Sequence, residues 1–266
     1  MYNRFELASR YLKYFFGASN GKGHGIHSPF IFDFVVNVLQ DTKKDLLLFR
    51  KIEEQRKLLK KSDQVLEVKD LGAGSGLNNS RSRSVSSIAK SAAKPPKYSQ
   101  LLYRIAVYYK VDSILELGTS LGLTTRYLSL AQPSNGVVTI EGAPTIASFA
   151  EEMFIQAGVN NIELLVGDFS AKLDVALLGM KGRKMIFFDG NHQYQSTMDY
   201  FRAALKVCGD QDMLIFDDIH WSGEMENAWK EIKKSEQVRC TIDLFFIGIV
   251  FFRKEFKEKL DFTIRF

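Results

Sequence analysis

The segment ILELGTSLGLTT, residues 114–125, has the pattern of a strand, a glycine turn and a helix in immediate succession. Ile114 and Leu115 end a short apolar run that predicts a buried strand. The turn that follows consists of small residues: Gly118, Thr119, Ser120 and, after Leu121, Gly122. Apolar periodicity over 123–130 then predicts a helix. Such a turn directs backbone N–H groups and a helix N-terminus toward a ligand at the carboxyl edge of a parallel sheet.

Segments with strand and helix periodicity alternate regularly beyond residue 98. The predicted strands cover 111–117, 137–142, 162–169, 185–190 and 213–218, and the predicted helices cover 99–109, 123–131, 144–157, 170–178, 195–207 and 223–234. This alternation is typical of a mostly parallel sheet with helices on both faces. Two further runs, 241–246 and 249–253, are joined tightly through Gly248, which predicts an antiparallel pair. We therefore expect a doubly wound, Rossmann-like α/β fold with a seven-stranded sheet and an antiparallel last strand.

The first 98 residues lack this alternation, and we expect a helical and loop extension ahead of a domain over 99–266. Residues 2–16 place aromatic and aliphatic side chains at helical spacing. Such a stripe packs on its own domain, on a second subunit or, less often, on a membrane surface, so a homodimer is one option. The segment 70–98 is rich in Gly, Ser, Lys and Arg, and we expect either a lid over the active site or a mobile linker.

The composition indicates a soluble globular protein. Apolar residues make up 45% and charged residues 25% of the chain, no apolar run is long enough to span a bilayer, and the first residues lack a signal-peptide pattern, which favours a cytoplasmic location. The net charge is +5, with residues 1–98 at +9 and residues 99–266 at −4. The basic part could attract an acidic partner, but its charges are scattered, and a solvated helical surface is the favoured interpretation.

Each predicted strand in the alternating series ends in an acidic residue. These residues are Glu116, Glu141, Asp168, Asp189 and the pair Asp217 and Asp218. Ligands bind at the carboxyl ends of the strands in open α/β sheets, and ionised carboxylates are costly to bury without partners. The turn lacks the tight G-x-G-x-x-G that pyrophosphate requires, which favours a nucleoside without phosphates over a dinucleotide.

These motifs resemble a known family. Residues 99–253 resemble the class I S-adenosylmethionine-dependent methyltransferases and, within them, the metal-dependent O-methyltransferases of the catechol and caffeoyl-CoA type. The residues that carry this resemblance are the helix 99–109 with ILELGTSLGLTT and the terminal antiparallel pair. The segments FFDGNHQY and IFDDIHWSGEMENAWKEI are also similar to a further set of bacterial methyltransferases.

The resemblance implies a set of residues for S-adenosylmethionine. Glu116 and Gly118 would hold its amino acid end, Glu141 its ribose, and Asp168 and Phe169 would flank its adenine. The neighbouring residues Thr119, Ser120, Gly122, Gly142 and Gly167 complete the set that we expect around the cofactor, with Asp189 beside it.

The resemblance also implies a site for a divalent cation at Asp189, Asp217 and Asp218. Asp218 stands where the family usually has Asn. Three carboxylates make a hard oxygen site suited to Mg²⁺ or another divalent cation. His192 occupies the position of the family's catalytic Lys, and an imidazole can accept a hydroxyl proton at neutral pH. We therefore expect Asp189 and His192 at the catalytic centre.

His220 and Trp221 follow the Asp pair, and we expect them to border a small-molecule acceptor. The function predicted from these observations is O-methylation of a small hydroxylated acceptor, with a divalent metal and with His192 as the base. Two alternatives stay open: a metal-free methyltransferase of nitrogen or nucleic acid, which lacks the N-P-P-Y type of motif here, and a cofactor- or partner-binding module without catalysis. A nucleic acid partner is not expected.

Overall fold

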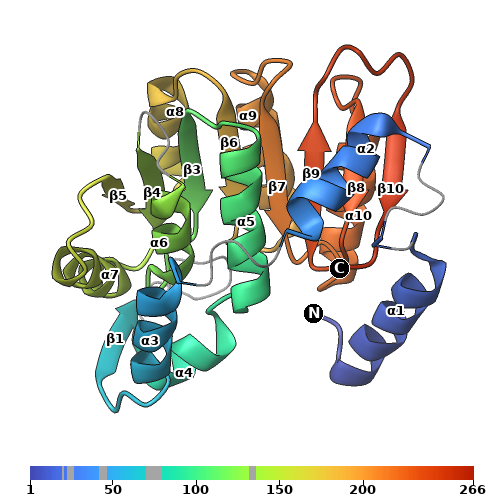
Figure 1. The fold of residues 1–266 in the computed structure, drawn as a ribbon. Helices are drawn as coiled ribbons and strands as arrows, with labels where there is room; N and C mark the ends of the chain where they lie inside the picture. Colours follow the sequence, from blue (N-terminus) through green and yellow to red (C-terminus); the bar gives the residue numbers. More distant parts are fainter. Residues whose placement is uncertain (20, 23–26, 42–46, 70–79, 132–135) are drawn as a thin grey trace. The chain divides into compact units, whose positions relative to one another are not determined.

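The computed structural model describes all residues except 20, 23–26, 42–46, 70–79 and 132–135. The chain divides into two compact units, one formed by Thr42–Gly182 and the other by Met1–Asp41 together with Arg183–Phe266. Among the described residues, no helix has the length and apolar character that a membrane span requires. Each unit is described separately below, with the labels of Figure 1.

The unit Thr42–Gly182 contains the glycine turn. Its parallel strands β3 (Ser113–Leu117), β4 (Val137–Glu141) and β5 (Ile162–Val166) lie side by side in this order. Its helices are α3 (Arg50–Leu59), α4 (Val85–Ser91), α5 (Pro96–Tyr108), α6 (Leu123–Leu130), α7 (Pro144–Gln156) and α8 (Phe169–Gly179). The sequence explains several helix starts: Pro96 and Pro144 occupy the first helical position, where the missing N–H has no cost.

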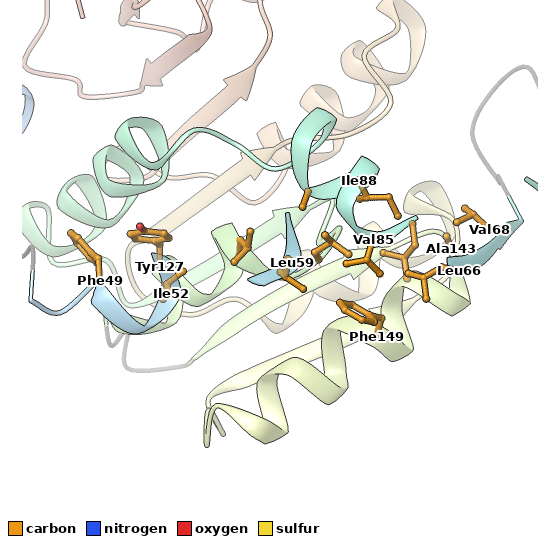
Figure 2. Packing of buried hydrophobic residues seen from close by; sticks show 14 of the residues in the cluster. Phe49, Ile52, Leu59, Leu66, Val68, Val85, Ile88, Tyr127, Ala143 and Phe149 are labelled. Atoms are coloured by element: carbon orange, nitrogen blue, oxygen red, sulfur yellow. The ribbon is translucent and has the colours of Figure 1, made fainter. Parts of the chain in front are cut away.

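A second, two-stranded sheet in this unit pairs β1 (Val65–Lys69) with β2 (Ser80–Ser84) in antiparallel fashion. Buried side chains of β1, α3, α4, α6 and α7 form one hydrophobic cluster, which Figure 2 shows from close by. Within it, the ring of Phe49 lies 5.0 Å from that of Tyr103 and 4.7 Å from that of Tyr127, measured between centroids. The cluster therefore joins the part before residue 98 to the helices around the turn.

The other unit contains strands β6 (Lys184–Phe188), β7 (Met213–Asp217), β8 (Cys240–Asp243), β9 (Ile247–Phe251) and β10 (Leu260–Thr263). They follow the order β10-β8-β9-β7-β6, with β6 parallel to β7, β9 antiparallel to both of its neighbours and β10 parallel to β8. Its helices are α1 (Arg4–Gly17), α2 (Pro29–Phe34), the π-helical turn η1 (Val35–Leu39), α9 (Tyr194–Leu205) and α10 (Gly223–Lys234). An Asn3 capping box starts α1, since the Asn3 side chain accepts the N–H groups of Phe5 and Glu6.

The predicted α/β fold is confirmed, with one additional strand. All seven predicted strands and all six helices predicted beyond residue 98 are present, and the pair β8 and β9 is antiparallel as expected. The additional strand is β10, which pairs with β8. The sequence missed β10, since its short segment LDFT forms a strand only through pairing with β8, which lies earlier in the chain.

The segment 70–98 differs from the expected lid or linker in its second half. Residues 70–79 lie outside the described residues, but residues from Ser80 to Ser91 form β2 and α4. The polar composition SRSRS concealed a strand because its backbone pairs with β1, and Val85 and Ile88 of α4 are buried in the cluster. The domain boundary at residue 98 stays a prediction.

Two adjacent leucines on α3 test the cluster of Figure 2. Leu59 is 5% exposed and Leu58 is 71% exposed. We expect Leu59→Ala to lower the free energy of unfolding by about 2–5 kcal/mol, because it leaves a cavity. Leu58→Ala changes only solvent-exposed surface and should stay within about 0.5 kcal/mol of the wild type. Urea denaturation of both variants measures the difference, and equal losses would contradict the packing described here.

Candidate cofactor and metal sites

The turn after β3 has a backbone that favours glycine. Gly118, Ser120 and Gly122 have φ angles of 108°, 49° and 73°. A Cβ atom at Gly122 would lie 2.5 Å from Cε1 of Phe154, so the turn packs directly against an aromatic ring of α7. The Gly118 N–H donates to the carbonyl of Ile140 at 2.9 Å, which ties the start of the turn to β4.

Glu116, the acidic residue of β3, is completely buried. Its Oε2 accepts hydrogen bonds from the hydroxyls of Thr125 on α6, at 2.5 Å, and Thr139 on β4, at 2.8 Å. Its Oε1 is buried and has no hydrogen-bond partner among the described residues. Burial raises the pKa of Glu116 to about 7, although the two threonine hydrogen bonds and the positive charge of Lys94 act in the opposite direction. The carboxyl group of Glu116 therefore links β3 to α6 and β4, the elements next to the turn. Its predicted contact with a cofactor stays a prediction.

Glu141, the last residue of β4, is half-buried and joins two loops. One carboxylate oxygen accepts the N–H of Ser120 at 2.8 Å, and the other accepts the N–H of Ala143 at 3.0 Å. Its carbonyl accepts the N–H of Gly167 at 2.9 Å. The structure thus brings the glycine turn and the end of β5 together around Glu141, the turn through its carboxylate and β5 through its backbone carbonyl. This agrees with the predicted cluster of strand ends.

The remaining predicted cofactor residues of this unit lie around the same edge. Asp168 is exposed and caps α8, because its Oδ1 accepts the N–H of Ser170 at 2.8 Å. Phe169 begins α8 and is half-buried. A Cβ added to Gly142 would meet nothing within 4 Å, so the space beside the end of β4 is open. These side chains are therefore available to a ligand or to solvent.

Three candidate metal ligands converge in the other unit. One ligand atom from each of Asp189, His192 and Asp217 lies within 4.8 Å of the other two. The register explains the meeting of the two carboxylates: β6 and β7 are parallel with Phe188 opposite Phe216, so Asp189 and Asp217 follow side by side. Asp217 is buried, whereas Asp189 and His192 are half-buried. Two carboxylates and an imidazole form a set that can hold a divalent cation.

The loop that carries His192 is anchored by Asn191. Asn191 has a φ of 52°, and its Nδ2 donates to Ser196 Oγ at 2.9 Å and to the Tyr200 hydroxyl at 3.2 Å. Both partners belong to α9, so this helix fixes the loop. Asparagine is one of the residues that tolerate this left-handed conformation.

Asp218 lies beside the three converging ligands. Its Oδ2 is 4.0 Å from Nε2 of His192, and its φ is 53°. The Asp218 N–H donates to the carbonyl of Phe246 at 2.6 Å, and its carbonyl accepts the N–H of Trp221 at 2.9 Å. The structure therefore brings His192 into the predicted metal set and places Asp218 next to that imidazole. Ligation by Asp218 stays a prediction.

His220 is bound on both ring nitrogens. Nε2 lies 2.7 Å from Asp243 Oδ2, Nδ1 lies 3.2 Å from Glu226 Oε1, and the ring stacks on Phe245 with centroids 5.1 Å apart. Burial opposes the imidazolium, but the hydrogen bonds and charges of Asp243 and Glu226 outweigh it and raise the pKa of His220. The predicted role of His220 and Trp221 beside an acceptor stays a prediction.

Glu226 extends this network to α1. Its carboxylate accepts from Arg10 Nη1 at 2.6 Å and from the Tyr2 hydroxyl at 3.1 Å, and the Tyr2 N–H donates to the carbonyl of Trp221 at 3.0 Å. Glu226 and Asp243 could not be identified from the sequence, because they have partners that are distant in the chain. Thr139 did carry a signal, since it is a polar residue in the interior of the strand VVTIE, and Thr125 carried none.

Comparison with known proteins identifies the domain. Residues 115–219 match the family model described as a methyltransferase domain. Over 133 residues the chain is 26% identical to a catechol O-methyltransferase of Niastella koreensis, a match that covers 49% of this chain and 59% of that protein. The chain therefore spans less than two thirds of this relative. The family model thus marks a methyltransferase domain over residues 115–219.

Solved structures show the same fold. An O-methyltransferase from Bacillus cereus in complex with SAH has a TM-score of 0.51 and 21% identity, over 60% of this chain and 83% of that chain. An O-methyltransferase from Streptomyces achromogenes in complex with SAM, involved in tomaymycin synthesis, has a TM-score of 0.53 and 21% identity, over 61% and 82%. At this identity, the likeness establishes the Rossmann-like methyltransferase fold and leaves the acceptor open.

Replacement of Gly122 tests the turn. Gly122→Ala places a side chain at a φ of 73° and brings its Cβ against Phe154. We expect the free energy of unfolding to fall by at least about 1–2 kcal/mol, the cost of a left-handed non-glycine residue before the steric clash is added. Gly142→Ala is the matched control, because its Cβ enters open space. Equal stability of the two variants in urea denaturation would be inconsistent with this turn.

The buried Glu116 predicts a pH dependence of stability. The pKa of Glu116 in the folded state, about 7, exceeds the ordinary glutamate pKa of 4.5. Between these two pH values the folded state therefore retains a proton that the unfolded state has lost. The stability that this difference in pKa contributes is fully present below pH 4.5 and is lost as the pH rises through 7. The loss in the free energy of unfolding is about 3 kcal/mol. Glu116→Gln cannot titrate and should lack this component. Urea denaturation between pH 4 and pH 8 measures it, and parallel curves for variant and wild type would exclude it.

Proposed function

We propose that this protein is an S-adenosylmethionine-dependent O-methyltransferase that acts on a small hydroxylated acceptor and uses a divalent cation. The observation that carries the proposal is the convergence of Asp189, His192 and Asp217 in a chain with a methyltransferase domain over 115–219. The named relative is a catechol O-methyltransferase, so a vicinal diol on an aromatic ring is the acceptor class to test first.

The end of β4 supports the assignment of S-adenosylmethionine as the methyl donor. Glu141 is half-buried and holds the turn at Ser120, and its carboxylate is the type of acceptor that binds ribose hydroxyls. The open space at Gly142 leaves room for a nucleoside there. Asp168 and Phe169, at the start of α8, would flank the adenine. Two similar solved structures contain SAH or SAM, which supports the same ligand here.

The donor set fits a divalent cation. Asp189 and Asp217 offer carboxylate oxygens, and His192 offers an imidazole nitrogen, within 4.8 Å of one another. Asp217 is buried, and a cation beside its carboxylate would favour the ionised form. Asp218 adds a further carboxylate beside His192. A cation held by the carboxylates of Asp189 and Asp217 would supply positive charge that favours the ionisation of an acceptor hydroxyl, and it would leave the imidazole of His192 able to accept a proton.

The imidazole of His192 accepts the hydroxyl proton in the proposed reaction. The acceptor oxygen then attacks the sulfonium methyl group, an oxygen–carbon bond forms as the carbon–sulfur bond breaks, and the sulfur keeps the electron pair. His192 returns its proton to solvent. Asp218 Oδ2, 4.0 Å from Nε2 of His192, stabilises the resulting imidazolium. The Asn191 anchor to α9 keeps the ring in this place.

His192 could instead ligate the cation, because its imidazole converges with the carboxylates of Asp189 and Asp217. A ring nitrogen that ligates a cation cannot accept a proton at the same time, so ligand and base are distinct assignments for that atom. The two assignments differ in measurable ways. A base predicts loss of turnover with metal affinity retained, whereas a ligand predicts loss of both.

The basic character of residues 1–98 keeps a nucleic-acid acceptor as the alternative substrate class. Binding that rests on phosphate contacts weakens steeply with salt, whereas a small neutral diol shows little salt dependence. A cofactor-binding module without catalysis predicts affinity for S-adenosylmethionine without turnover.

Calorimetric titration of the metal-stripped protein with S-adenosylmethionine, with and without Mg²⁺, tests the proposal. We expect cofactor binding in the wild type and Mg²⁺ binding that falls at least about tenfold in Asp217→Asn, because a ligand carboxylate is lost. Turnover is followed as S-adenosylhomocysteine formed from catechol. His192→Gln should lower kcat by about 10²–10⁴-fold, the usual contribution of a general base.

The matched controls are Asp199→Asn, an exposed carboxylate on α9, and His27→Gln, an exposed histidine. Both should bind and turn over as the wild type does. No binding of S-adenosylmethionine under either condition would refute the methyltransferase assignment. Cofactor binding with turnover that is independent of Mg²⁺ and of Asp217 would refute the metal and leave the methyltransferase.

A further inference from the structure

Helix α1 is drawn in blue in Figure 1. It carries apolar side chains on two faces, of which one packs in a cluster with Phe245 and the other is exposed. On the packed face, Tyr14 is buried against Phe245, with ring centroids 5.2 Å apart, and Tyr11 stacks on Phe246 at 6.3 Å. Leu7 belongs to the same cluster. This face confirms the expectation that the aromatic stripe of 2–16 packs on its own domain.

The opposite face carries a second apolar stripe that the protein leaves in solvent. Phe5, Leu12 and Phe16 are 89%, 54% and 76% exposed. Leu12 and Phe16 follow Phe5 by seven and eleven residues, or about two and three helical turns, so the three side chains align along one side of α1. Exposed aromatic rings in such alignment mark an interaction surface rather than scattered surface residues.

Basic residues flank this stripe on both sides. Arg4 precedes Phe5 and Lys13 follows Leu12, and neighbours in a helix are about 100° apart around the axis, so the two positive charges project to either side. Glu6 lies on the same side as Lys13, where its carboxylate accepts the N–H of Asn3 at 2.7 Å. Neither Arg4 nor Lys13 forms an ion pair with a described residue. The other two arginines nearby are engaged: Arg10 binds Glu226, and Arg265 donates to the carbonyl of Phe15 at 2.5 Å.

The charges discriminate between two occupants of this face. A second copy of α1 would bring the same net positive charge to this face, because Arg4, Arg10 and Lys13 outnumber Glu6, the one acidic residue of the helix. An anionic lipid surface instead accepts the rings at the acyl boundary while its head groups face both cations. We propose that α1 docks this protein on anionic membrane surfaces, with Phe5, Leu12 and Phe16 inserted.

The fold presents the helix in a fixed orientation. The Tyr14 hydroxyl donates to the carbonyl of Ile264, and the Ser19 N–H donates to the carbonyl of Thr263 at 2.9 Å. Helix α1 is therefore already formed before it binds, so no conformational entropy is lost at the membrane to fold it. A single helix with two free cations gives reversible, salt-sensitive attachment rather than permanent anchoring.

Vesicle flotation of the full chain tests this proposal. We expect the wild type to float with vesicles of phosphatidylglycerol and phosphatidylcholine in low salt, and to stay unbound with phosphatidylcholine alone. Phe5→Gln combined with Phe16→Gln should reduce the partition coefficient at least about tenfold, since two inserted rings are lost. Arg4→Glu combined with Lys13→Glu should also reduce it about tenfold or more.

Matched controls come from the other unit. Leu178→Gln removes a side chain that is 79% exposed on α8, and Lys51→Glu with Lys57→Glu reverses two exposed charges on α3. Both should float as the wild type does, and circular dichroism checks that every variant is folded. Absence of flotation with anionic vesicles overturns the proposal. So does a dimer in sedimentation velocity that the double glutamine variant dissociates, because α1 would then bind a second copy.

Discussion

Two hydrogen bonds to the buried carboxylate of Glu116 connect β3 with α6 and β4 in the methyltransferase domain. One carboxylate oxygen of Glu116 accepts hydrogen bonds from the hydroxyls of Thr125 on α6 and Thr139 on β4. The Thr139 hydroxyl also lies 2.7 Å from the hydroxyl of Thr119 in the glycine turn. Strand, turn and helix are thereby connected through a single buried group. An apolar residue at this position would avoid the cost of desolvation, but it would leave the hydroxyls of Thr125 and Thr139 without that partner.

Much of this domain was predictable because the periodicity of its segments is local. Apolar runs of strand length, the glycine turn and the acidic residue at each strand end are visible in the sequence, and all seven predicted strands are present. The parts that were not predictable depend on distant partners. SRSRS becomes β2 only because β1 pairs with it, and LDFT becomes β10 only because β8 pairs with it. Tertiary context outweighed local composition in both cases.

The candidate site also has a part that the sequence predicts and a part that depends on distant partners. The approach of Asp189 to Asp217 follows from the parallel register of β6 and β7, which strand ends in a sequence already imply. The surroundings of His220 could not be foreseen, because Asp243 lies on β8 and Tyr2 and Arg10 lie at the start of the chain. A histidine beside an aspartate pair suggested an acceptor pocket. Both of its nitrogens contact carboxylates, which links β8, α10 and, through Glu226, α1, and its role beside an acceptor stays a prediction.

The discontinuous unit has a consequence for the order of events during synthesis. Met1–Asp41 associates with Arg183–Phe266, while Thr42–Gly182 is continuous in sequence. The continuous unit can collapse as soon as it has left the ribosome, because all its partners are present. Helix α1 is made first, yet its aromatic face meets Phe245 and Ile264 only when the last strands emerge. Long loop closure slows such association, so the aromatic face of α1 lacks these partners until the segment with Phe245 and Ile264 has been made.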